Sequence, residues 1–293
     1  MAKITKAVLP VAGLGTRFLP VTKSVPKELL PLVDRPCLEY IVAEAVEAGL
    51  DEIIFVISRG KEAILDYFDR SPSLEASLEA AGKLDMAKEV RKVASYAKVV
   101  AVRQPETLGL GHAVACAAPA TGDSDFAVLL GDDIIDSTIP GIAQLLSVHE
   151  ERGGCEVALL EVPREHTDRY GICAGEMVSD SVMHVTSMVE KPKPEDAPSN
   201  LSIVGRYVLP ARIHTILGST PRGRGGEIQL TDALAVLAAE GSAWGVKFEG
   251  KRFDTGNFLG LLDATLHFAG KRPHMVNGLQ ELLAKYTLNT SNK

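Results

Sequence analysis

The sequence lacks the features that mark several common classes of protein. Its four cysteines, Cys37, Cys116, Cys155 and Cys173, are never separated by only two residues, which excludes a C-x-x-C zinc ribbon or thioredoxin-type site. No apolar run approaches the ~20 residues that a membrane helix needs. The first apolar run is interrupted at Pro10, too early for a signal peptide. We therefore expect free thiols in a cytoplasmic protein without a membrane partner.

Positive charge is also in short supply. The chain has 31 Lys and Arg against 38 Asp and Glu, a net charge of −7, which argues against a general nucleic-acid binder. Apolar residues make up 46% and charged residues 24% of its 293 residues. This composition is typical of a soluble globular protein, and the length allows one large domain or two modest ones.

The first half of the chain alternates short β-branched runs with helix-like apolar spacing. The runs lie at residues 7–11, 52–57, 98–102 and 126–130, and the helical spacings at 38–48, 63–68, 112–118 and 142–149. Alternation of this kind predicts an α/β fold, with a Rossmann-like, mainly parallel sheet flanked by helices. Residues 71–95 interrupt it with a polar helical insertion.

The second half is richer in strands. Strand-like runs lie at residues 157–162, 171–178, 182–189 and 203–208, with few helices between them. They predict a β-rich, antiparallel extension of the same sheet. Residues 257–286 then read as two helices separated near Pro273.

The first predicted strand runs directly into Gly13-Leu14-Gly15. Loops of this type bind ligands at the carboxyl edge of a parallel sheet. The dinucleotide fingerprint needs a third glycine where Phe18 stands, and the Walker G-K-[ST] is absent, which disfavours a nicotinamide dehydrogenase. Residues 13–35 hold four basic and two acidic side chains. This local positive charge suits a polyphosphate, although a solvated charge run is the alternative.

The stretch G-L-G-T-R-F-L-P-V-T-K-S-V-P-K-E-L-L-P-L-V-D-R-P resembles the signature loop of sugar-nucleotide pyrophosphorylases, most closely their bacterial uridylyltransferases, and the likeness extends over residues 3–270. It implies a single nucleotide-diphospho-sugar transferase domain, 1–293. Within it, residues 1–155 would bind nucleotide, 156–256 would bind sugar phosphate, and 257–293 would be C-terminal helices. In the family this loop wraps the triphosphate. The implied catalytic cations are Arg17 and Lys27, and the implied nucleotide-binding residues of the loop are Ala12, Gly13, Gly15 and Glu28.

Residues 103–113 read R-Q-P-E-T-L-G-L-G-H-A. The amide of Gln104 offers a donor and an acceptor, and uracil presents O4 beside N3–H, so one amide can pair with both. A glutamine at a strand end can also be plain surface. The family resemblance implies that Gln104 and Gly109 form the uracil pocket, with His112 as a structural residue or a phosphate neighbour.

Residues 126–133 read F-A-V-L-L-G-D-D. Consecutive side chains of a strand point to opposite faces, and Mg²⁺ takes one or two carboxylates plus substrate phosphates. We therefore assign Asp132 to Mg²⁺ and leave Asp133 as a helper or turn-former. A paired-carboxylate hydrolase is the rival interpretation. The related thymidylyl branch implies Asp254 as a second metal ligand, in F-D-T-G-N, where Thr255 replaces a frequent cysteine.

The V-E-K-P motif at 189–192 matches the sugar-phosphate site of the family. The resemblance implies that Glu190 accepts hydrogen bonds from sugar hydroxyls and that Lys191 binds the sugar phosphate. Pro192 predicts an extended Lys191, although K-P-K-P by itself looks like a linker. Further implied sugar-binding residues are Gly171, Val204, Gly205 and Glu227. Alternatively, Glu227 stabilises the dipole of a helix that residues 226–232 open.

The resemblance implies Mg²⁺-dependent transfer of a uridylyl group from UTP to glucose 1-phosphate in carbohydrate metabolism, by a homodimer or homotetramer. The attacking phosphate oxygen is already anionic at neutral pH, so catalysis needs positioning and charge neutralisation. Two alternatives stay open. One is a relative directed to thymidylyl transfer or to N-acetylhexosamine 1-phosphate. The other is a catalytically silent regulatory subunit that binds nucleotide sugars.

Overall fold

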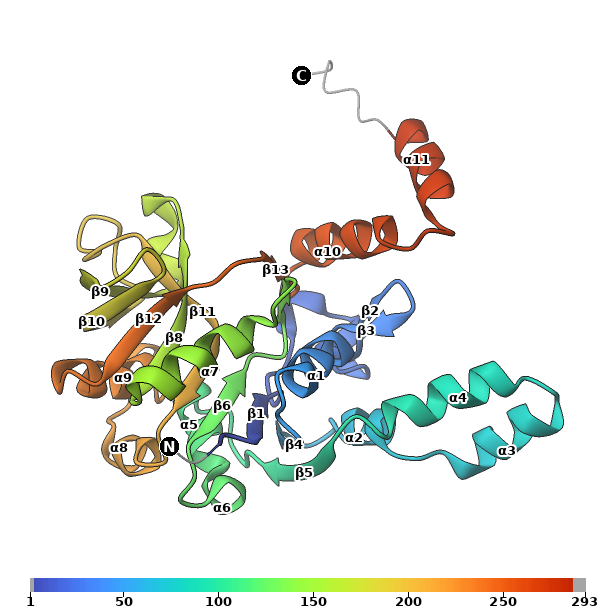
Figure 1. Cartoon of the computed structure of the whole chain (residues 1–293), viewed down its shortest axis with the longest axis horizontal. Coiled ribbons are helices and arrows are strands. Elements are labelled where there is room, and N and C mark those ends of the chain that lie inside the picture. Colours follow the sequence, from blue (N-terminus) through green and yellow to red (C-terminus); the bar gives the residue numbers. More distant parts are fainter. Residues whose placement is uncertain (1–2, 287–293) are drawn as a thin grey trace.

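The computed structural model describes residues 3–286, so residues 287–293 of the predicted C-terminal segment lie outside the described part. Its centre is one nine-stranded sheet (Figure 1). In spatial order the strands are β5 (Lys98–Arg103), β4 (Glu52–Ile57), β1 (Lys6–Pro10), β6 (Phe126–Leu129), β11 (Leu201–Leu209), β8 (Cys155–Glu161), β12 (Ala243–Lys247), β10 (Val182–Glu190) and β9 (Gly171–Met177).

The direction of the strands changes across the sheet. β5, β4, β1 and β6 pair in parallel, as the alternating pattern predicts. β11 then runs antiparallel to both β6 and β8. The second half is not wholly antiparallel, contrary to the prediction, because β12 pairs in parallel with β8. Two helices, α8 (Ile213–Ser219) and α9 (Leu230–Ala239), lie in the connection between β11 and β12.

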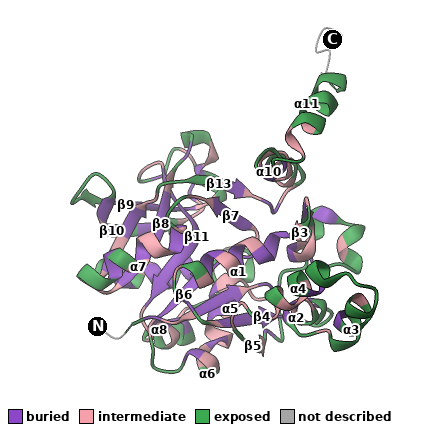
Figure 2. Ribbon diagram, turned by 45° about the vertical axis from the view of Figure 1, so that its right-hand side comes forward, coloured by how far each residue is buried: buried purple, intermediate pink, exposed green. Residues whose placement is uncertain are grey.

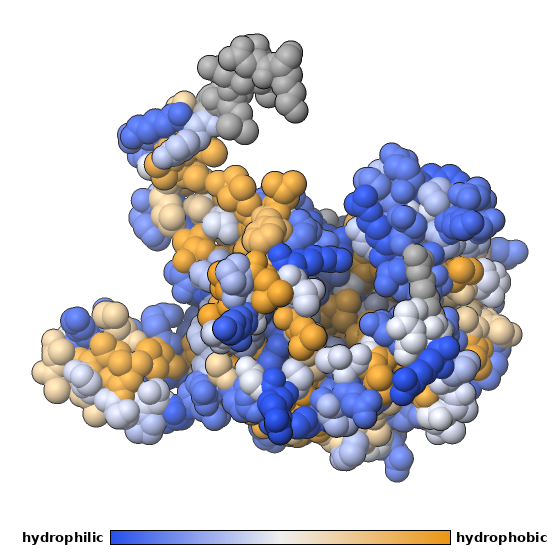
Figure 3. All heavy atoms as spheres, turned by 180° about the vertical axis from the view of Figure 1, so that it is seen from behind, coloured by the Kyte–Doolittle hydropathy of each residue, from blue (hydrophilic) through white to orange (hydrophobic). Residues whose placement is uncertain are grey.

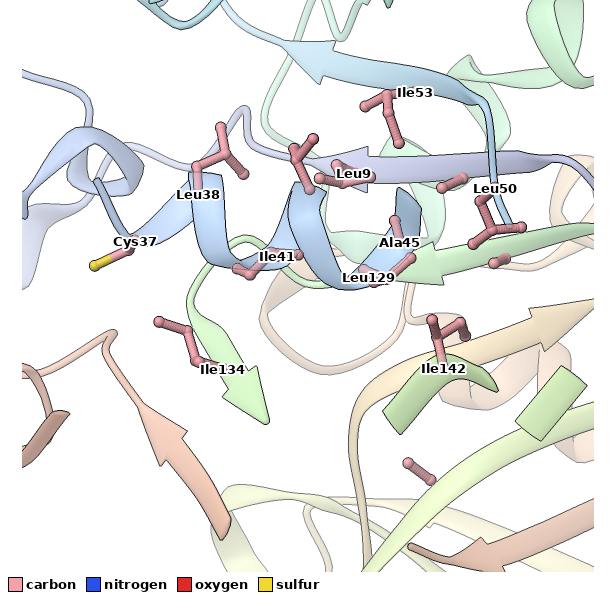
Figure 4. Close-up of a cluster of buried hydrophobic side chains, with 14 of the residues drawn as sticks. Leu9, Cys37, Leu38, Ile41, Ala45, Leu50, Ile53, Leu129, Ile134 and Ile142 are labelled. Atoms are coloured by element: carbon pink, nitrogen blue, oxygen red, sulfur yellow. The ribbon is translucent and has the colours of Figure 1, made fainter. Parts of the chain in front are cut away.

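Helices cover both faces of the sheet, and alternation along β1 shows which helix covers which face. Leu9 packs in one core cluster with side chains of α1 (Cys37–Glu47) and α7 (Gly141–Arg152), which Figure 4 shows at close range. Val8 packs in the other cluster, with side chains of α5 (Leu110–Cys116) and α9. The buried strands between these helix layers form the centre of the molecule (Figure 2).

Two helical segments project from this body (Figure 1). The predicted insertion forms α3 (Pro72–Ala80) and α4 (Leu84–Val93), after the short α2 (Ala63–Phe68). The two predicted C-terminal helices are α10 (Phe258–Gly270) and α11 (Val276–Lys285). Large apolar side chains are exposed on these C-terminal helices, among them Phe258, Leu259, Leu262, Leu282 and Leu283, and Figure 3 shows apolar residues gathered there.

A small separate sheet that the sequence did not predict brings two distant segments together. β7 (Asp133–Asp136) pairs antiparallel with β13 (Lys251–Asp254), and Asp254 lies opposite Asp133. Just beyond this ladder, the backbone N–H and the hydroxyl of Thr255 donate to the carbonyl oxygen of Asp132 at 2.8 and 2.9 Å. Residues 132 and 254 are therefore fixed side by side, although 122 positions separate them.

The remaining elements are short. They are β2 (Pro31–Leu32), β3 (Arg35–Pro36), α6 (Ala118–Thr121) and the 3₁₀ helices η1 (Thr16–Phe18), η2 (Val21–Lys23), η3 (Lys27–Leu29), η4 (Arg164–Arg169) and η5 (Arg224–Gly226). Within residues 3–286, no helix combines the length and apolar character needed to cross a membrane. All four cysteines are free thiols.

Candidate active site

Two adjoining cavities gather most of the predicted site residues. The first, of about 410 Å³, is lined by the loop after β1 and by the loop after β5. The second, of about 340 Å³, is lined by β9, β10, β11 and the ends of β6 and β13. Leu110 and Glu227 line both cavities, so the two share a wall.

The predicted residues divide between the cavities. The first cavity receives Ala12, Gly13, Gly15, Gln104, Gly109 and Glu227. The second receives Asp132, Gly171, Glu190, Lys191, Gly205, Glu227 and Asp254. Four predicted residues, Arg17, Lys27, Glu28 and Val204, line neither. The side chain of Val204 is buried in the hydrophobic core.

The glycine loop is a chain of three 3₁₀ turns between β1 and β2. Gly15 has a left-handed backbone with φ 64°, and a Cβ there would lie 3.2 Å from Lys27 Cβ and from Thr22 Cγ2. The hydroxyl of Thr22 donates to the Gly15 carbonyl at 2.8 Å. At Gly13, by contrast, a Cβ would meet nothing within 4 Å. Gly15 therefore allows the loop to close on itself, whereas Gly13 leaves exposed backbone beside the first cavity.

Glu28 belongs to the third of these turns and lines neither of the two cavities. Its carboxylate is 1% exposed and accepts two hydrogen bonds from the Lys61 ammonium, at 2.7 and 3.0 Å. Burial raises the pKa of Glu28 despite this partner. The structure thus shows Glu28 as a buried anchor of the loop. Arg17 is exposed, with Nη1 3.4 Å from the carbonyl oxygen of Gly256.

Gln104 follows β5 and is buried at the back of the first cavity. Its amide nitrogen lies 3.2 Å from the carbonyl oxygen of Gly109 and 3.1 Å from Nδ1 of His112. The carbonyl of Gly109 can only accept, so the nitrogen is correctly placed toward it, and both amide hydrogens are engaged in the His112 tautomer whose Nδ1 accepts. The prediction that one amide both donates to and accepts from uracil therefore changes. In this arrangement only Oε1 can meet the base, as an acceptor.

The two predicted metal carboxylates flank Gly256. A Cβ built on that buried glycine would lie 2.7 Å from Asp132 Oδ2 and 3.0 Å from Asp254 Oδ1. Both oxygens thus lie close to Gly256, where a side chain would crowd them, and hard carboxylate donors fit Mg²⁺. No group of three or more His, Cys, Asp or Glu side chains among residues 3–286 could hold a metal ion. A cation there would complete its shell with oxygens of substrate or water.

The ammonium of Lys27 forms an ion pair with Oδ2 of Asp132. Burial opposes the charge on both groups, but each group stabilises the charged form of the other. The pKa of Lys27 is raised and the pKa of Asp132 is lowered. Lys27 thus contacts Asp132, a predicted metal ligand that lines the second cavity, although Lys27 itself lines neither cavity.

Asp133 has a different partner from Asp132. It is buried and paired with Arg252, and a Cβ on Gly205 would lie 2.6 Å from Asp133 Oδ2. Gly205 therefore leaves room for Asp133, and it also lines the second cavity, so its approach to a hexose stays a prediction. Arg206 is fully buried, pairs with Glu44, and donates from Nη2 to the Asp133 carbonyl at 2.8 Å.

Sequence reasoning missed Arg169, Arg206 and Arg252. Arg169 and Arg252 line the second cavity. Arg206 fixes the backbone next to Asp132 through its hydrogen bond to the Asp133 carbonyl oxygen. Arg206 directly follows Gly205 and Arg252 directly precedes the F-D-T-G-N stretch, but neither arginine belongs to the motif beside it. An arginine inside the apolar run 201–209 was the one available signal, because a buried charge requires a partner.

Lys191 differs from its predicted conformation. Its φ is 47°, a left-handed backbone, and not the extended conformation that Pro192 predicted. The reason is the strand end: its N–H still donates to the Tyr170 carbonyl at 2.9 Å while the chain turns away from β10. The conformation avoids the right-handed helical region that a following proline disfavours, at a cost of about 1–2 kcal/mol for a residue with a Cβ.

Glu190 and Glu227 both line the second cavity. Glu190 accepts from the Thr231 hydroxyl at 2.6 Å and lies 3.1 Å from the Lys191 ammonium. Glu227 is not in a helix, because α9 begins three residues later at Leu230. The helix predicted to open over residues 226–232 therefore begins later than expected, and the dipole role of Glu227 stays a prediction.

Comparisons with known proteins define the class. A family model described as nucleotidyl transferase matches residues 6–270, and the chain belongs to this nucleotidyl transferase family. A UTP–glucose-1-phosphate uridylyltransferase of Bacillus subtilis (strain 168) is 46% identical over 289 residues, covering 97% of this chain and 99% of the relative.

Solved structures agree with this relative. A UTP-bound UGPase from Acinetobacter baumannii is 43% identical with a TM-score of 0.89, covering 97% of this chain and 99% of its own. A UDP-glucose pyrophosphorylase complexed with UDP-glucose is 39% identical with a TM-score of 0.84, covering 92% and 100%. These similarities confirm the α/β fold class and the resemblance to sugar-nucleotide pyrophosphorylases.

Proposed function

We propose that this chain transfers a uridylyl group from UTP to glucose 1-phosphate, giving UDP-glucose and pyrophosphate. The observation that supports it best is the pair of adjoining cavities. A buried amide that can read a base lies in one, and a lysine, a glutamate and two metal-type carboxylates lie in the other. The relatives named above act on, or are solved with, these same compounds.

In the proposed reaction, an oxygen of the sugar phosphate forms a bond to the α-phosphorus of UTP, and the bond from that phosphorus to the β-phosphate bridging oxygen breaks. Lys191 orients the attacking phosphate, and Glu190 accepts hydrogen bonds from the sugar hydroxyls. Arg17 and Lys27 offset the negative charge of the triphosphate. No side chain has to remove a proton, so the residues act by positioning and electrostatics.

We propose that Asp132 and Asp254 hold Mg²⁺ between them, beside Gly256. When bound, the ion would neutralise phosphate charge and act as a Lewis acid. The donor set and the space at Gly256 support this assignment.

We propose that Gln104 selects uracil by accepting a hydrogen bond from N3–H. Cytosine has a lone pair at N3, so the same Oε1 would repel it. Gln104→Ala should weaken the use of UTP by about 1–3 kcal/mol, because a buried base edge loses its partner. Steady-state kcat/KM values for UTP and CTP measure the change.

His112 provides the matched control for this prediction. His112→Ala leaves Oε1 in place and frees only one amide hydrogen, so it should alter UTP use less than Gln104→Ala does. Unchanged discrimination between UTP and CTP in Gln104→Ala would remove Gln104 from base recognition.

The proposed function is tested by a matrix of nucleoside triphosphates against sugar 1-phosphates with Mg²⁺, read as release of pyrophosphate. UTP with glucose 1-phosphate should give the highest kcat/KM. A higher value with dTTP or with an N-acetylhexosamine 1-phosphate would favour the related pyrophosphorylases. No turnover with any pair, together with tight binding of UDP-glucose, would favour a regulatory subunit.

We also propose that the protein works in the cytoplasm as a homodimer or homotetramer. Free thiols at all four cysteines agree with a reducing compartment. Exposed apolar side chains on α10 and α11 provide a surface that a second copy of the chain could cover.

A further inference from the structure

Lys27 makes a contact that its proposed task on the triphosphate does not explain. Its ammonium is paired with Oδ2 of Asp132, and that same oxygen faces the space at Gly256, 2.7 Å from where a Cβ would stand. The oxygen that would bind a metal ion is therefore already used by a cation of this chain.

The charges around Lys27 explain why it is attracted to this place. Its side chain is only 20% exposed. Burial opposes its charge, yet Asp132, Glu28 and Asp254 together raise the pKa of Lys27. The Glu28 carboxylate also accepts two hydrogen bonds from Lys61. Asp132 and Asp254 are the two of these three carboxylates that lie beside Gly256.

A divalent cation and an ammonium that both contact Oδ2 of Asp132 repel each other, because like charges interact strongly at such distances. Without a cation, on the other hand, the two carboxylates beside Gly256 repel each other. One positive charge is required there, and either Lys27 or a metal ion can supply it.

We propose that Lys27 takes the place of the metal ion when no metal is bound. Its ammonium neutralises Asp132 and Asp254 in the metal-free enzyme and moves away when the ion binds. The inference rests on the proposed function, because it is the triphosphate of the bound nucleotide to which the ammonium would move. Binding of nucleotide then draws Lys27 off Asp132 and strengthens binding of the metal, and binding of the metal strengthens binding of nucleotide by the same factor.

The test is the affinity for Mn²⁺ alone, with no nucleotide, measured from the electron paramagnetic resonance signal of the free ion. Lys27→Met removes the competing charge, so Mn²⁺ should bind at least about tenfold more tightly than to the wild type, equivalent to ~1.4 kcal/mol. The same variant should bind UTP more weakly in EDTA. Opposite effects of one substitution on two ligands are the signature of the exchange.

Matched variants isolate the contact. Lys23→Met removes one exposed charge from the same loop and should leave the Mn²⁺ affinity within about twofold of the wild type. Lys27→Arg keeps a cation on Asp132 and should restore the wild-type affinity. Asp132→Asn in the Lys27→Met background should abolish the gain, which assigns the tighter site to this carboxylate.

One result would overturn the proposal. Unchanged or weaker Mn²⁺ binding by a folded Lys27→Met protein would make Lys27 a phosphate ligand or a structural residue only. If Lys27→Met does not fold, the Lys27→Gln variant takes its place, with the same tighter binding expected. The titration uses no substrate, so absence of uridylyl transfer in the wild type would refute the proposed function without changing this result.

Discussion

Asp132→Asn should lower kcat/KM by about 1000-fold or more at ordinary Mg²⁺ concentrations, equivalent to ~4 kcal/mol of transition-state stabilisation. The substitution keeps the shape of the side chain and removes its charge. It deprives the proposed ion of one of its two protein carboxylates and deprives Lys27 of its partner. Partial recovery at high Mg²⁺ would show that the loss is one of metal affinity, and steady-state kinetics across a Mg²⁺ series measures both effects.

Two further aspartates give controls for this prediction. Asp136, on the same strand β7, is paired with Lys271 at 2.7 Å and lines neither cavity of the site. Asp136→Asn therefore changes the charge equally and should keep nearly full activity. Asp133→Asn should mainly lower the free energy of unfolding, because it leaves the buried Arg252 without its partner. A mild Asp132→Asn beside a crippling, well-folded Asp133→Asn would place the metal on the other face of the strand.

The α/β half of the fold could be predicted from local pattern. The strand 52–57 and the helix 63–68 were predicted with the bounds that the structure shows, because a short β-branched run and a 3–4 apolar spacing each follow from burial on defined faces. The side of the sheet on which each helix packs could not be predicted in this way. It depends on pairings such as that of β11 between β6 and β8, which join segments far apart in the chain.

The site was predicted best where each of its parts comes from a short continuous motif. Gly13, Gly15 and Gln104 reach the same cavity because the glycine loop and the end of β5 lie at the same edge of a parallel sheet. The approach of Asp132 and Asp254 to Gly256 required the pairing of β7 with β13, and neither short strand has a distinctive apolar pattern. The roles of Gly205 and Glu28 were obscured for the same reason, since their neighbours Asp133 and Lys61 are distant in sequence.

Lys191 marks the limit of local reasoning. Pro192 restricts its backbone, but the hydrogen bond from its N–H to Tyr170 determines which permitted conformation it adopts. Strained backbone that surrounding structure enforces often lies at functional sites. The left-handed conformation carries the side chain into the second cavity, beside Glu190.

Lys191→Ala should lower kcat/KM for glucose 1-phosphate by about 100- to 1000-fold, because losing one preorganised charged donor in a water-poor site costs ~3–4 kcal/mol of transition-state stabilisation. Binding of UTP should change far less, since Arg17 and Lys27 belong to the other loop. Steady-state kinetics in glucose 1-phosphate, paired with equilibrium binding of UTP, separates the two substrates.

Two variants distinguish the charge of Lys191 from its backbone. Lys193, two residues along the same K-P-K-P stretch, is exposed, so Lys193→Ala should change activity or stability by no more than about 0.5 kcal/mol. Lys191→Gly loses the ammonium as Lys191→Ala does, yet glycine adopts φ 47° without strain. The glycine variant should therefore be as inactive as the alanine variant while being more stable to denaturant.

Normal kinetics in glucose 1-phosphate with weakened UTP binding would assign Lys191 to the nucleotide. Equal stability of the two variants would show that the turn imposes no strain, and activity retained in both would return the K-P-K-P stretch to its interpretation as a linker.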